Sequence, residues 1–235
     1  YHELRRDGEA VIDELVRALV RFSYLLAEQR RIREIALYPV ILSPRGAGAL
    51  KAEVSLHGAN IPEDQLPGPA VTPYPHQYTH RWTTKQNIEM IIRPIRPEDE
   101  QMLADLHRSM SPESVYFRYF TMMGLEQRIS HDRLVRTCFI DYDREMALVA
   151  IHAKPEGDTM TAIGRLTKLH DSPDAHFAIA VADAYHRQGL GSKLLRSIID
   201  VARADGVRRL IGHILPENRG MQETCKKVGF EVDYD

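Results

Sequence analysis

Two glycines stand in a short loop between an apolar segment, residues 177–181, and the start of an amphipathic helix. The first backbone N–H groups of a helix lack acceptors within the helix and carry a partial positive charge. Because Gly189 and Gly191 have no Cβ atoms, an anion can approach these N–H groups closely. Arg187 and Ser192 add side-chain donors. The loop therefore has the composition of a phosphate or pyrophosphate site, although a tight strand-to-helix turn would need the same glycines.

Two other phosphate loops do not match this segment. The pattern Gly-x-x-x-x-Gly-Lys-[Ser/Thr] is absent from the chain, and Gly-x-Gly-x-x-Gly would need a third glycine after Gly191. A nucleotide site of either type is therefore not expected here.

The composition argues against several classes of function. The charges nearly balance, with 31 Lys and Arg against 33 Asp and Glu, so a nucleic-acid partner has no electrostatic support. Cys138 and Cys225 form no Cys-x-x-Cys pair, and the eleven histidines follow no metal-binding spacing, so we expect no metal site. No apolar run approaches the ~20 residues that cross a bilayer, and no signal peptide is visible. We therefore expect no membrane partner and a cytoplasmic location.

Residues 1–70 predict a small α/β unit. Apolar residues repeat every three or four positions over residues 12–26, which indicates an amphipathic helix. Two β-rich runs follow at residues 35–42 and 49–56, separated by a turn of Ser, Pro and Gly. This unit buries too little surface to fold alone. The Pro-rich stretch after it predicts a linker at residues 71–87.

Residues 88–235 predict a second α/β domain, in which strands alternate with helices in the last half. Proline followed by acidic residues predicts helices that open near Pro97 and Pro112, and longer helices are predicted at residues 189–206 and 218–228. The predicted strands are residues 89–93, 146–152, 161–169, 176–181, 210–215 and 230 onward.

Three motifs of this domain occur in one order. They are Arg187-Gln188-Gly189-Leu190-Gly191 after an apolar strand, then Asn218-x-x-Met221, then Gly229-Phe230. In this the domain resembles the GNAT acetyltransferases, which implies the GNAT fold, a mixed central sheet with flanking helices. The resemblance also implies that strand, glycine loop and following helix bind acetyl-CoA. The implied contact residues are Ile179, Ala180, Val181, His186, Arg187, Gln188, Gly189, Leu190, Gly191, Ser192, Asn218 and Met221.

Upstream motifs narrow the resemblance. They are Arg93-Pro94-Ile95-Arg96-Pro97-Glu98-Asp99, Ser111-Pro112-Glu113-Ser114 and Asp141-Tyr142-Asp143-Arg144. With them the domain resembles the bacterial Pat-type protein lysine acetyltransferases. In long members of that family, the domain follows a region similar to NDP-forming acyl-CoA synthetases, and residues 1–70 resemble the end of its ATP-grasp-like part. Ala36, Tyr38 and Lys51 replace the expected oxygen ligands of magnesium and ATP, so we expect no working nucleotide site there.

Three positions of the domain depart from the family pattern. His186 stands where the loop usually has Gln or Arg, so one side-chain contact to phosphate is not assured. Cys225 stands where many members have a tyrosine as general acid; it either protonates the departing thiolate or is a small buried residue. His176 replaces a glutamate, and histidine titrates near neutrality and can take a proton from an amine. We predict His176 as the general base, with His170 and Asp174 as alternatives, although a surface histidine is the plainer interpretation.

The resemblance implies an N-acetyltransferase that moves an acetyl group from acetyl-CoA directly to an amine, a protein lysine in the Pat-type enzymes. The same site could serve a small amine. The alternative is a catalytically weak acyl-CoA-binding regulatory module, which the changes at His176, His186 and Cys225 would fit. By analogy with the family, the first acceptor to try is the active-site lysine of an AMP-forming acyl-CoA synthetase. Because the chain opens without methionine and stops as a predicted strand begins, we expect it to be part of a longer protein.

Overall fold

The computed structural model describes residues 2–43, 46–62, 65–67 and 73–233, and the chain divides into two compact units, residues 1–73 and 74–235. Each unit is described by itself.

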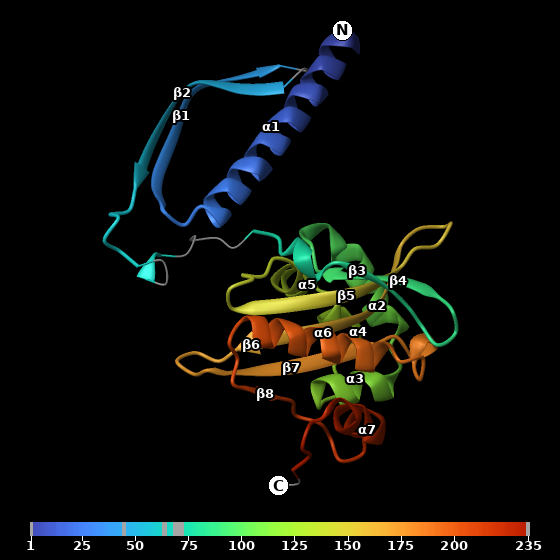
Figure 1. The fold of residues 1–235 in the computed structure, drawn as a ribbon. Coiled ribbons are helices and arrows are strands. Elements are labelled where there is room, and N and C mark those ends of the chain that lie inside the picture. Colours follow the sequence, from blue (N-terminus) through green and yellow to red (C-terminus); the bar gives the residue numbers. More distant parts are fainter. Residues whose placement is uncertain (1, 44–45, 63–64, 68–72, 234–235) are drawn as a thin grey trace. The chain divides into compact units, whose positions relative to one another are not determined.

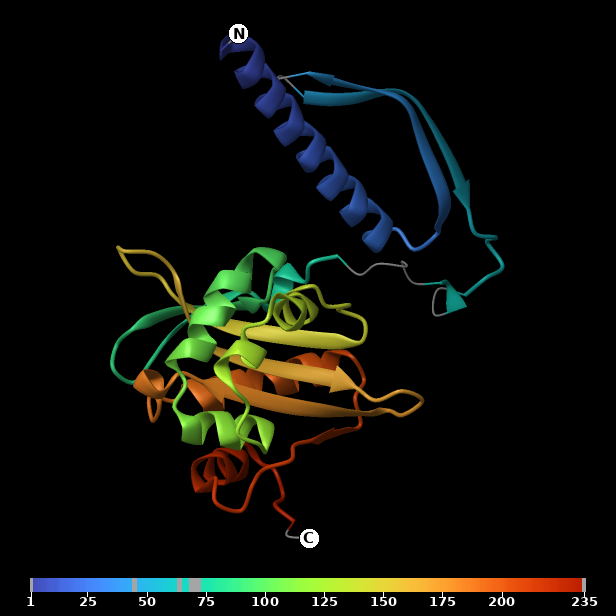
Figure 2. The same ribbon diagram turned by 180° about the vertical axis from the view of Figure 1, so that it is seen from behind.

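The described residues of the first unit form one helix and one hairpin (Figures 1 and 2). The helix α1 spans His2–Glu28, and the antiparallel strands are β1, Ile32–Ser43, and β2, Gly46–Leu56. The predicted helix and strands are confirmed, and both strands are longer than predicted. Among the residues whose burial is described in this unit, Leu66 is the one buried apolar side chain, and Ile12, Val16 and Leu19 are more than half exposed. The described part of this unit therefore has almost no core of its own.

The second unit is built on a six-stranded sheet in the order β3-β4-β5-β6-β7-β8. All neighbouring strands are antiparallel except the parallel pair β7 and β8. The strands are β3 His80–Thr83, β4 Glu89–Pro94, β5 Glu145–His152, β6 Thr159–Lys168, β7 Asp174–Val181 and β8 Arg209–Ile211.

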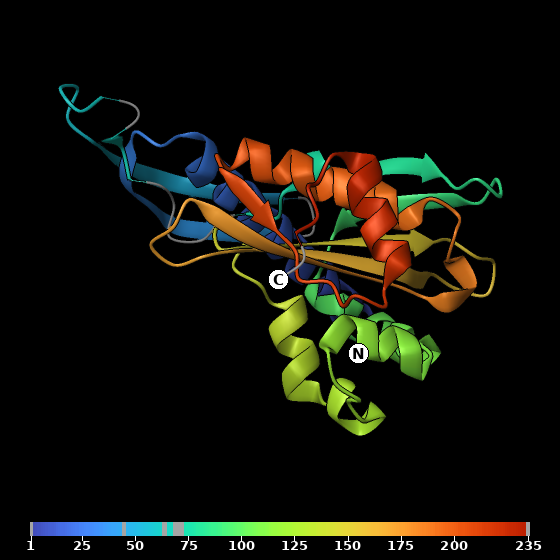
Figure 3. The same ribbon diagram turned by 90° about the horizontal axis from the view of Figure 1, so that it is seen from below.

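Helices cover both faces of this sheet, which confirms the predicted α/β class (Figure 3). On one face lie α2 Glu100–Ser109, α3 Pro112–Tyr119, α4 Leu125–Arg128 and α5 His131–Cys138. On the other face lie α6 Leu190–Ala204 and α7 Arg219–Val228. Short 3₁₀ turns occur at His76–Tyr78, Pro97–Asp99 and Asp183–Tyr185.

Alternation along the strands separates two buried cores. Leu148, Leu166 and Phe177 pack under α6 and α7, whereas Val149 and Ala180 pack under α2 to α5. Each strand therefore sends every second side chain to the same helical layer.

A buried ion pair within the motif at residues 93–99 connects β4 to the helices of the α2–α5 layer. Arg93 and Asp99 are 8% and 1% exposed, and two parallel hydrogen bonds of 2.7 Å join the guanidinium to the carboxylate. Asp99 also accepts the backbone N–H of Arg96 at 2.8 Å. Because every oxygen of the buried carboxylate has a partner, the pair ties β4 to the start of α2.

Three sequence predictions differ from the structure. The predicted linker at residues 71–87 contains β3, which pairs with β4, and the boundary between the units falls between Pro73 and Tyr74. The strand predicted at residues 210–215 ends at Ile211. Residues 230–233 form no strand, because Phe230 turns back and packs its ring 5.1 Å from that of Phe177.

Candidate active site

The strands β7 and β8 are paired over three residues and then separate. Asp174, Ala175 and His176 pair with residues 209–211, and the β8 strand ends there. Beyond this point the edge of β7 at residues 177–181 has no partner strand among the described residues. Apart from Val181 O, which lies 2.9 Å from His186 Nε2, alternate backbone N–H and C=O groups along that edge are therefore available to a ligand with amide groups.

The open edge leads directly to the start of α6. Gly189 precedes this helix with a φ of +88°, a left-handed conformation that favours glycine. The N–H groups of residues 190–192 have no acceptor within the helix, and Lys193 is the first residue to donate back, to Gly189 O at 3.0 Å. A Cβ added at Gly191 would lie 3.9 Å from a methyl of Val181, at the end of the open edge. The predicted anion site is thus the junction of β7 and α6.

A cation that the sequence analysis missed lies beside this loop. The backbone N–H of Lys85, in the turn between β3 and β4, donates to Gln188 O at 3.2 Å. The Lys85 stem and the Trp82 ring lie within 3.8 Å of where a Cβ of Gly189 would be. Together with the exposed Arg187, Lys85 can bring positive charge to a ligand at the α6 start. The position of Lys85 depends on β3, and the sequence analysis assigned β3 to a linker.

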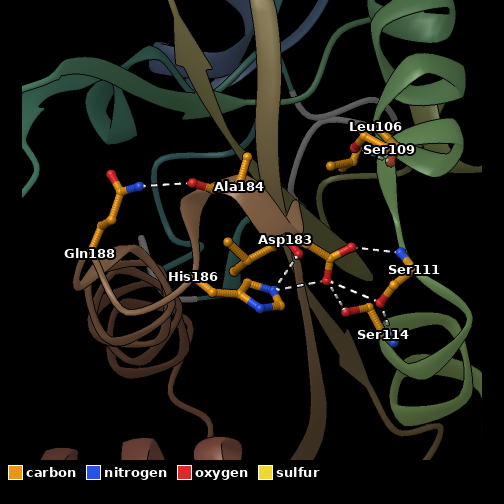
Figure 4. A network of polar contacts seen from close by, with 9 residues as sticks. Leu106, Ser109, Ser111, Ser114, Asp183, Ala184, His186 and Gln188 are labelled. Atoms are coloured by element: carbon orange, nitrogen blue, oxygen red, sulfur yellow. Dashed lines mark hydrogen bonds and ion pairs between the residues drawn. The ribbon is translucent and has the colours of Figure 1, made fainter.

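Asp183 anchors the loop to the opposite helical layer (Figure 4). Its carboxylate accepts the backbone N–H of Ser111 at 2.6 Å and the hydroxyl of Ser114 at 2.5 Å. Burial opposes ionisation of this carboxyl, but the hydrogen bonds from Ser114 and Ser111 outweigh it and lower the pKa of Asp183. Asp183 therefore stays ionised and joins the N-terminus of α3 to the segment before α6.

Two side chains of the predicted phosphate contacts turn toward the protein. His186 Nε2 lies 2.9 Å from Val181 O and 3.7 Å from the Asp183 carboxylate (Figure 4). Gln188 is 3% exposed, and its amide donates to Ala184 O at 2.9 Å. These side chains shape the loop, and the backbone N–H groups, Arg187 and Lys85 are left to contact a ligand.

The predicted base lies where the two strands separate. His176 is partly buried on the face of β7 that points to the α2–α5 layer, and its ring centre is 5.1 Å from that of the exposed His213. His213 follows β8, so the two imidazoles face each other across the opening. The alternatives are less suited: the Arg209 guanidinium holds the pKa of Asp174 below its usual range, and the exposed His170 lies beside Asp171 in the β6–β7 turn.

The structure places Cys225 inside the core under α6 and α7, at 2% exposure. Burial raises the pKa of its thiol to about 11. A thiol with this pKa is a poor acid for a thiolate whose own pKa is near that of an ordinary thiol, about 8.5. The geometry therefore favours the small buried residue over the general acid.

Asn218 and Met221 are joined by a hydrogen bond at the start of α7. The Asn218 side-chain oxygen accepts the backbone N–H of Met221 at 3.1 Å, which caps the helix, and Met221 packs against the core. The asparagine that the motif assigns to cofactor binding thus has a structural task in this chain.

The comparison with known protein families matches residues 89–231 to the acetyltransferase (GNAT) domain. The matched range begins at β4 and includes the open edge of β7, the glycine loop and α7. The chain belongs to the GNAT acetyltransferases. An acetyltransferase of Pseudomonas aeruginosa is 30% identical over 146 residues, which cover 62% of this chain and 77% of the relative.

Solved structures share the fold of this GNAT domain. The GNAT domain of S. lividans PAT superposes with a TM-score of 0.61 at 25% identity, over 68% of this chain and 92% of that domain. Mycobacterium smegmatis RimJ, solved with CoA-disulfide, superposes with a TM-score of 0.52 at 14% identity, over 66% of this chain and 76% of RimJ. The predicted GNAT fold is confirmed.

Acetyl-CoA is the cofactor of GNAT domains, and the residues present fit it. The free N–H groups of residues 190–192, with Arg187 and Lys85 beside them, suit its diphosphate. The open edge of β7 suits the amide groups of its pantetheine arm.

The described residues contain no group of three or more His, Cys, Asp or Glu side chains placed to hold a metal ion. No described helix is both long and apolar enough to span a membrane.

Proposed function

We propose that this GNAT domain acetylates the side-chain amine of a protein lysine by direct transfer, with His176 as general base. The observation that carries this proposal is the position of His176 at the mouth of the open β7 edge, with a second imidazole, that of His213, 5.1 Å away. Acetyl-CoA supplies the acetyl group as a thioester. A lysine amine must lose its proton before it can attack, and a neutral imidazole at the opening can accept that proton.

Direct transfer is supported by the burial of both cysteines, which makes neither of them suitable as a nucleophile. Cys138 and Cys225 are 1% and 2% exposed, and burial raises the pKa values of their thiols to about 12 and about 11. Neither thiol is a thiolate near neutrality, and neither is accessible, so neither is suited to carry the acetyl group. The amine then attacks the thioester carbon itself: the C–N bond forms, the C–S bond breaks, the nitrogen gives its second proton to solvent, and CoA leaves as a thiolate that takes a proton from solvent.

Likeness to the S. lividans PAT domain supports a protein acceptor, and an AMP-forming acyl-CoA synthetase stays the first partner to test. The Pat-type arrangement, in which residues 1–70 are a remnant of an ATP-grasp-like region, is likewise a proposal, and the cytoplasmic location stays a prediction from the sequence.

The experiment is a transfer assay with three acceptor classes. Acetyl-CoA and the protein are incubated with an AMP-forming acyl-CoA synthetase, with the same enzyme carrying arginine at its active-site lysine, and with small polyamines. We expect thiol release and one acetylated lysine with the first acceptor alone. Acetylation of small amines only would overturn the protein acceptor. Acetyl-CoA binding without transfer to any acceptor would instead favour the regulatory module.

A further inference from the structure

A polar recess opens on the same face of the sheet as His176. It has a volume of about 520 Å³ and lies between α5 and the ends of β5 and β6. Arg133, Arg136 and Arg165 line it, together with the carboxylates of Asp132 and Glu145. None of these groups belongs to the acetyl-CoA site described above.

Positive charge exceeds negative charge by one in this recess, since three guanidinium groups and two carboxylates line it. Arg165 is engaged by Glu145, but its Nε is buried without a hydrogen-bond partner in the described part of the chain. Arg133 and Arg136 form no ion pair with another described residue; the Arg133 guanidinium lies 5.1 Å from the centre of the Tyr119 ring.

A further guanidinium, which does not line the recess, interacts with the charges of this group. Arg118 lies 5.0 Å from the same Tyr119 ring and has no carboxylate partner in the described chain. Burial lowers the pKa of Arg118, the neighbouring Tyr119 raises it, and the charges of Arg165 and Arg133 lower it further. Guanidinium groups that crowd together without enough carboxylates form a site for an external anion.

The register of the sheet gives the distance from this recess to the predicted base. Thr167 stands opposite Glu145 on one side and opposite His176 on the other, and all three side chains are on the α2–α5 face. Directly opposed residues are about 5 Å apart, so Glu145 and His176 are separated by about 10 Å. An extended peptide places residues i and i+2 on one side about 7 Å apart, which lets neighbouring side chains reach both points.

We propose that this recess binds a carboxylate of the acceptor, supplied by a glutamate or aspartate two residues from the lysine that is acetylated. This inference rests on the proposed amine acetylation and names the acceptor class: a lysine in an acidic segment. A guanidinium fork binds a carboxylate through two hydrogen bonds, and a recess of this size admits one such side chain. A phosphate shares this chemistry, and the test separates the two.

The test compares lysine peptides that carry Glu, Gln or phosphoserine at positions −2 and +2. At saturating acetyl-CoA we expect kcat/KM for the Glu peptide to exceed that for the Gln peptide by about tenfold, chiefly through KM, since a hydrogen bond to a charged group contributes at least this much. Equal values for the two peptides would overturn the proposal. A preference for phosphoserine over Glu would overturn the carboxylate assignment.

Variants locate the effect. Arg136→Gln should reduce the preference for Glu to about threefold or less, and Arg136→Lys, which keeps the charge, should retain part of it. The matched control is Arg203→Gln, an exposed arginine of α6 on the opposite face, which should keep the full preference. A preference that survives Arg136→Gln and the double variant with Arg133→Gln would contradict the assignment.

A binding measurement separates this proposal from the proposed function. A Glu peptide with norleucine in place of lysine cannot react, and we expect calorimetry with the acetyl-CoA-loaded protein to show that it binds about tenfold tighter than its Gln counterpart. Suppose that no lysine peptide is acetylated, but the parent protein still binds the Glu peptide more tightly and Arg136→Gln does not. The proposed function then fails and the anion site stands. If the difference is absent, the anion site fails whatever the activity.

Discussion

His176 is a single imidazole whose contribution can be measured separately from cofactor binding. General bases contribute roughly 10²–10⁴-fold in rate, so we expect His176→Ala to lose about that much kcat while keeping its affinity for acetyl-CoA. His176→Glu should retain more activity and shift the acidic limb of the pH–rate profile downward, because a carboxylate has an ordinary pKa of about 4.3 against 6.5 for imidazole. His170→Ala, in the exposed β6–β7 turn, is the control. If His176→Ala keeps turnover within about threefold of the parent, below the general-base range, His213 becomes the next candidate.

Gly191 keeps side-chain atoms away from the end of the open edge. In Gly191→Val, the added methyl groups would lie between Val181 and the N–H groups that start α6, since a Cβ alone already comes within 3.9 Å of Val181. We expect calorimetry to show at least about a tenfold loss of CoA affinity, or 1.4 kcal/mol. Gly124→Val, a position before α4 with no atom within 4 Å of an added Cβ, should bind CoA normally. Undiminished CoA affinity of Gly191→Val would contradict the assignment of the loop.

Among the elements, the α2–α5 layer contains a histidine that is neutral in the folded protein near neutral pH. His107, in the last turn of α2, is 6% exposed, and burial together with Arg128, Arg133 and Arg118 lowers its pKa to about 4. The unfolded chain takes up a proton at an ordinary pKa of about 6.5, whereas the folded chain does not, so stability falls as the pH decreases from about 6.5 to about 4.

The expected size of this loss is about 2 kcal/mol between pH 7 and pH 5. Urea unfolding of the parent and of His107→Phe, followed by near-ultraviolet circular dichroism, measures it. The variant should lose about 2 kcal/mol less than the parent over this range, because the carboxylates that titrate nearby are common to both proteins. Equal losses in the two proteins would show that His107 is not responsible.

Elements with strong periodicity could be predicted from the sequence, and elements that depend on distant partners could not. The α6 helix and strands β5 to β7 were expected within one or two residues of their observed bounds. The apolar runs of the strands and the glycine that ends the helix are both signals in the local sequence. The β3 strand is four residues long and follows prolines, so its pairing with β4 leaves no local signal. For the same reason Lys85 was missed.

The predicted site shows the same division. The strand and the glycine loop lie together as expected, because both belong to one continuous segment, residues 177–192. The roles of Gln188 and Cys225 could not be predicted, since burial decides whether a polar side chain faces ligand or protein. Asp183 carried no signal either, because its partners Ser111 and Ser114 are about 70 residues away in the sequence.

For the whole molecule, the first unit bears on nucleotide binding. Ala36, Tyr38 and Lys51 lie on the hairpin, where Lys51 donates to Tyr38 at 2.8 Å and pairs with Glu53 at 2.5 Å. A lysine amine and a phenol offer magnesium no carboxylate at these positions. We expect titration with ATP and magnesium, followed by calorimetry, to give no heat of binding to this unit. Saturable micromolar binding that is lost in Lys51→Ala would contradict this, with Arg33→Ala on the same hairpin as control.

The short pairing of β7 with β8 leaves a strand edge inside a folded domain. Strand edges pair with the edges of other chains, and proteins usually protect them with charge, bulges or a covering segment. Residues 177–181 present small and apolar side chains without a charge among them, so no charged side chain of this segment protects the edge. A ligand that satisfies these backbone groups therefore also closes a place where two molecules could join, and the same contacts that bind acetyl-CoA would guard the protein against self-association.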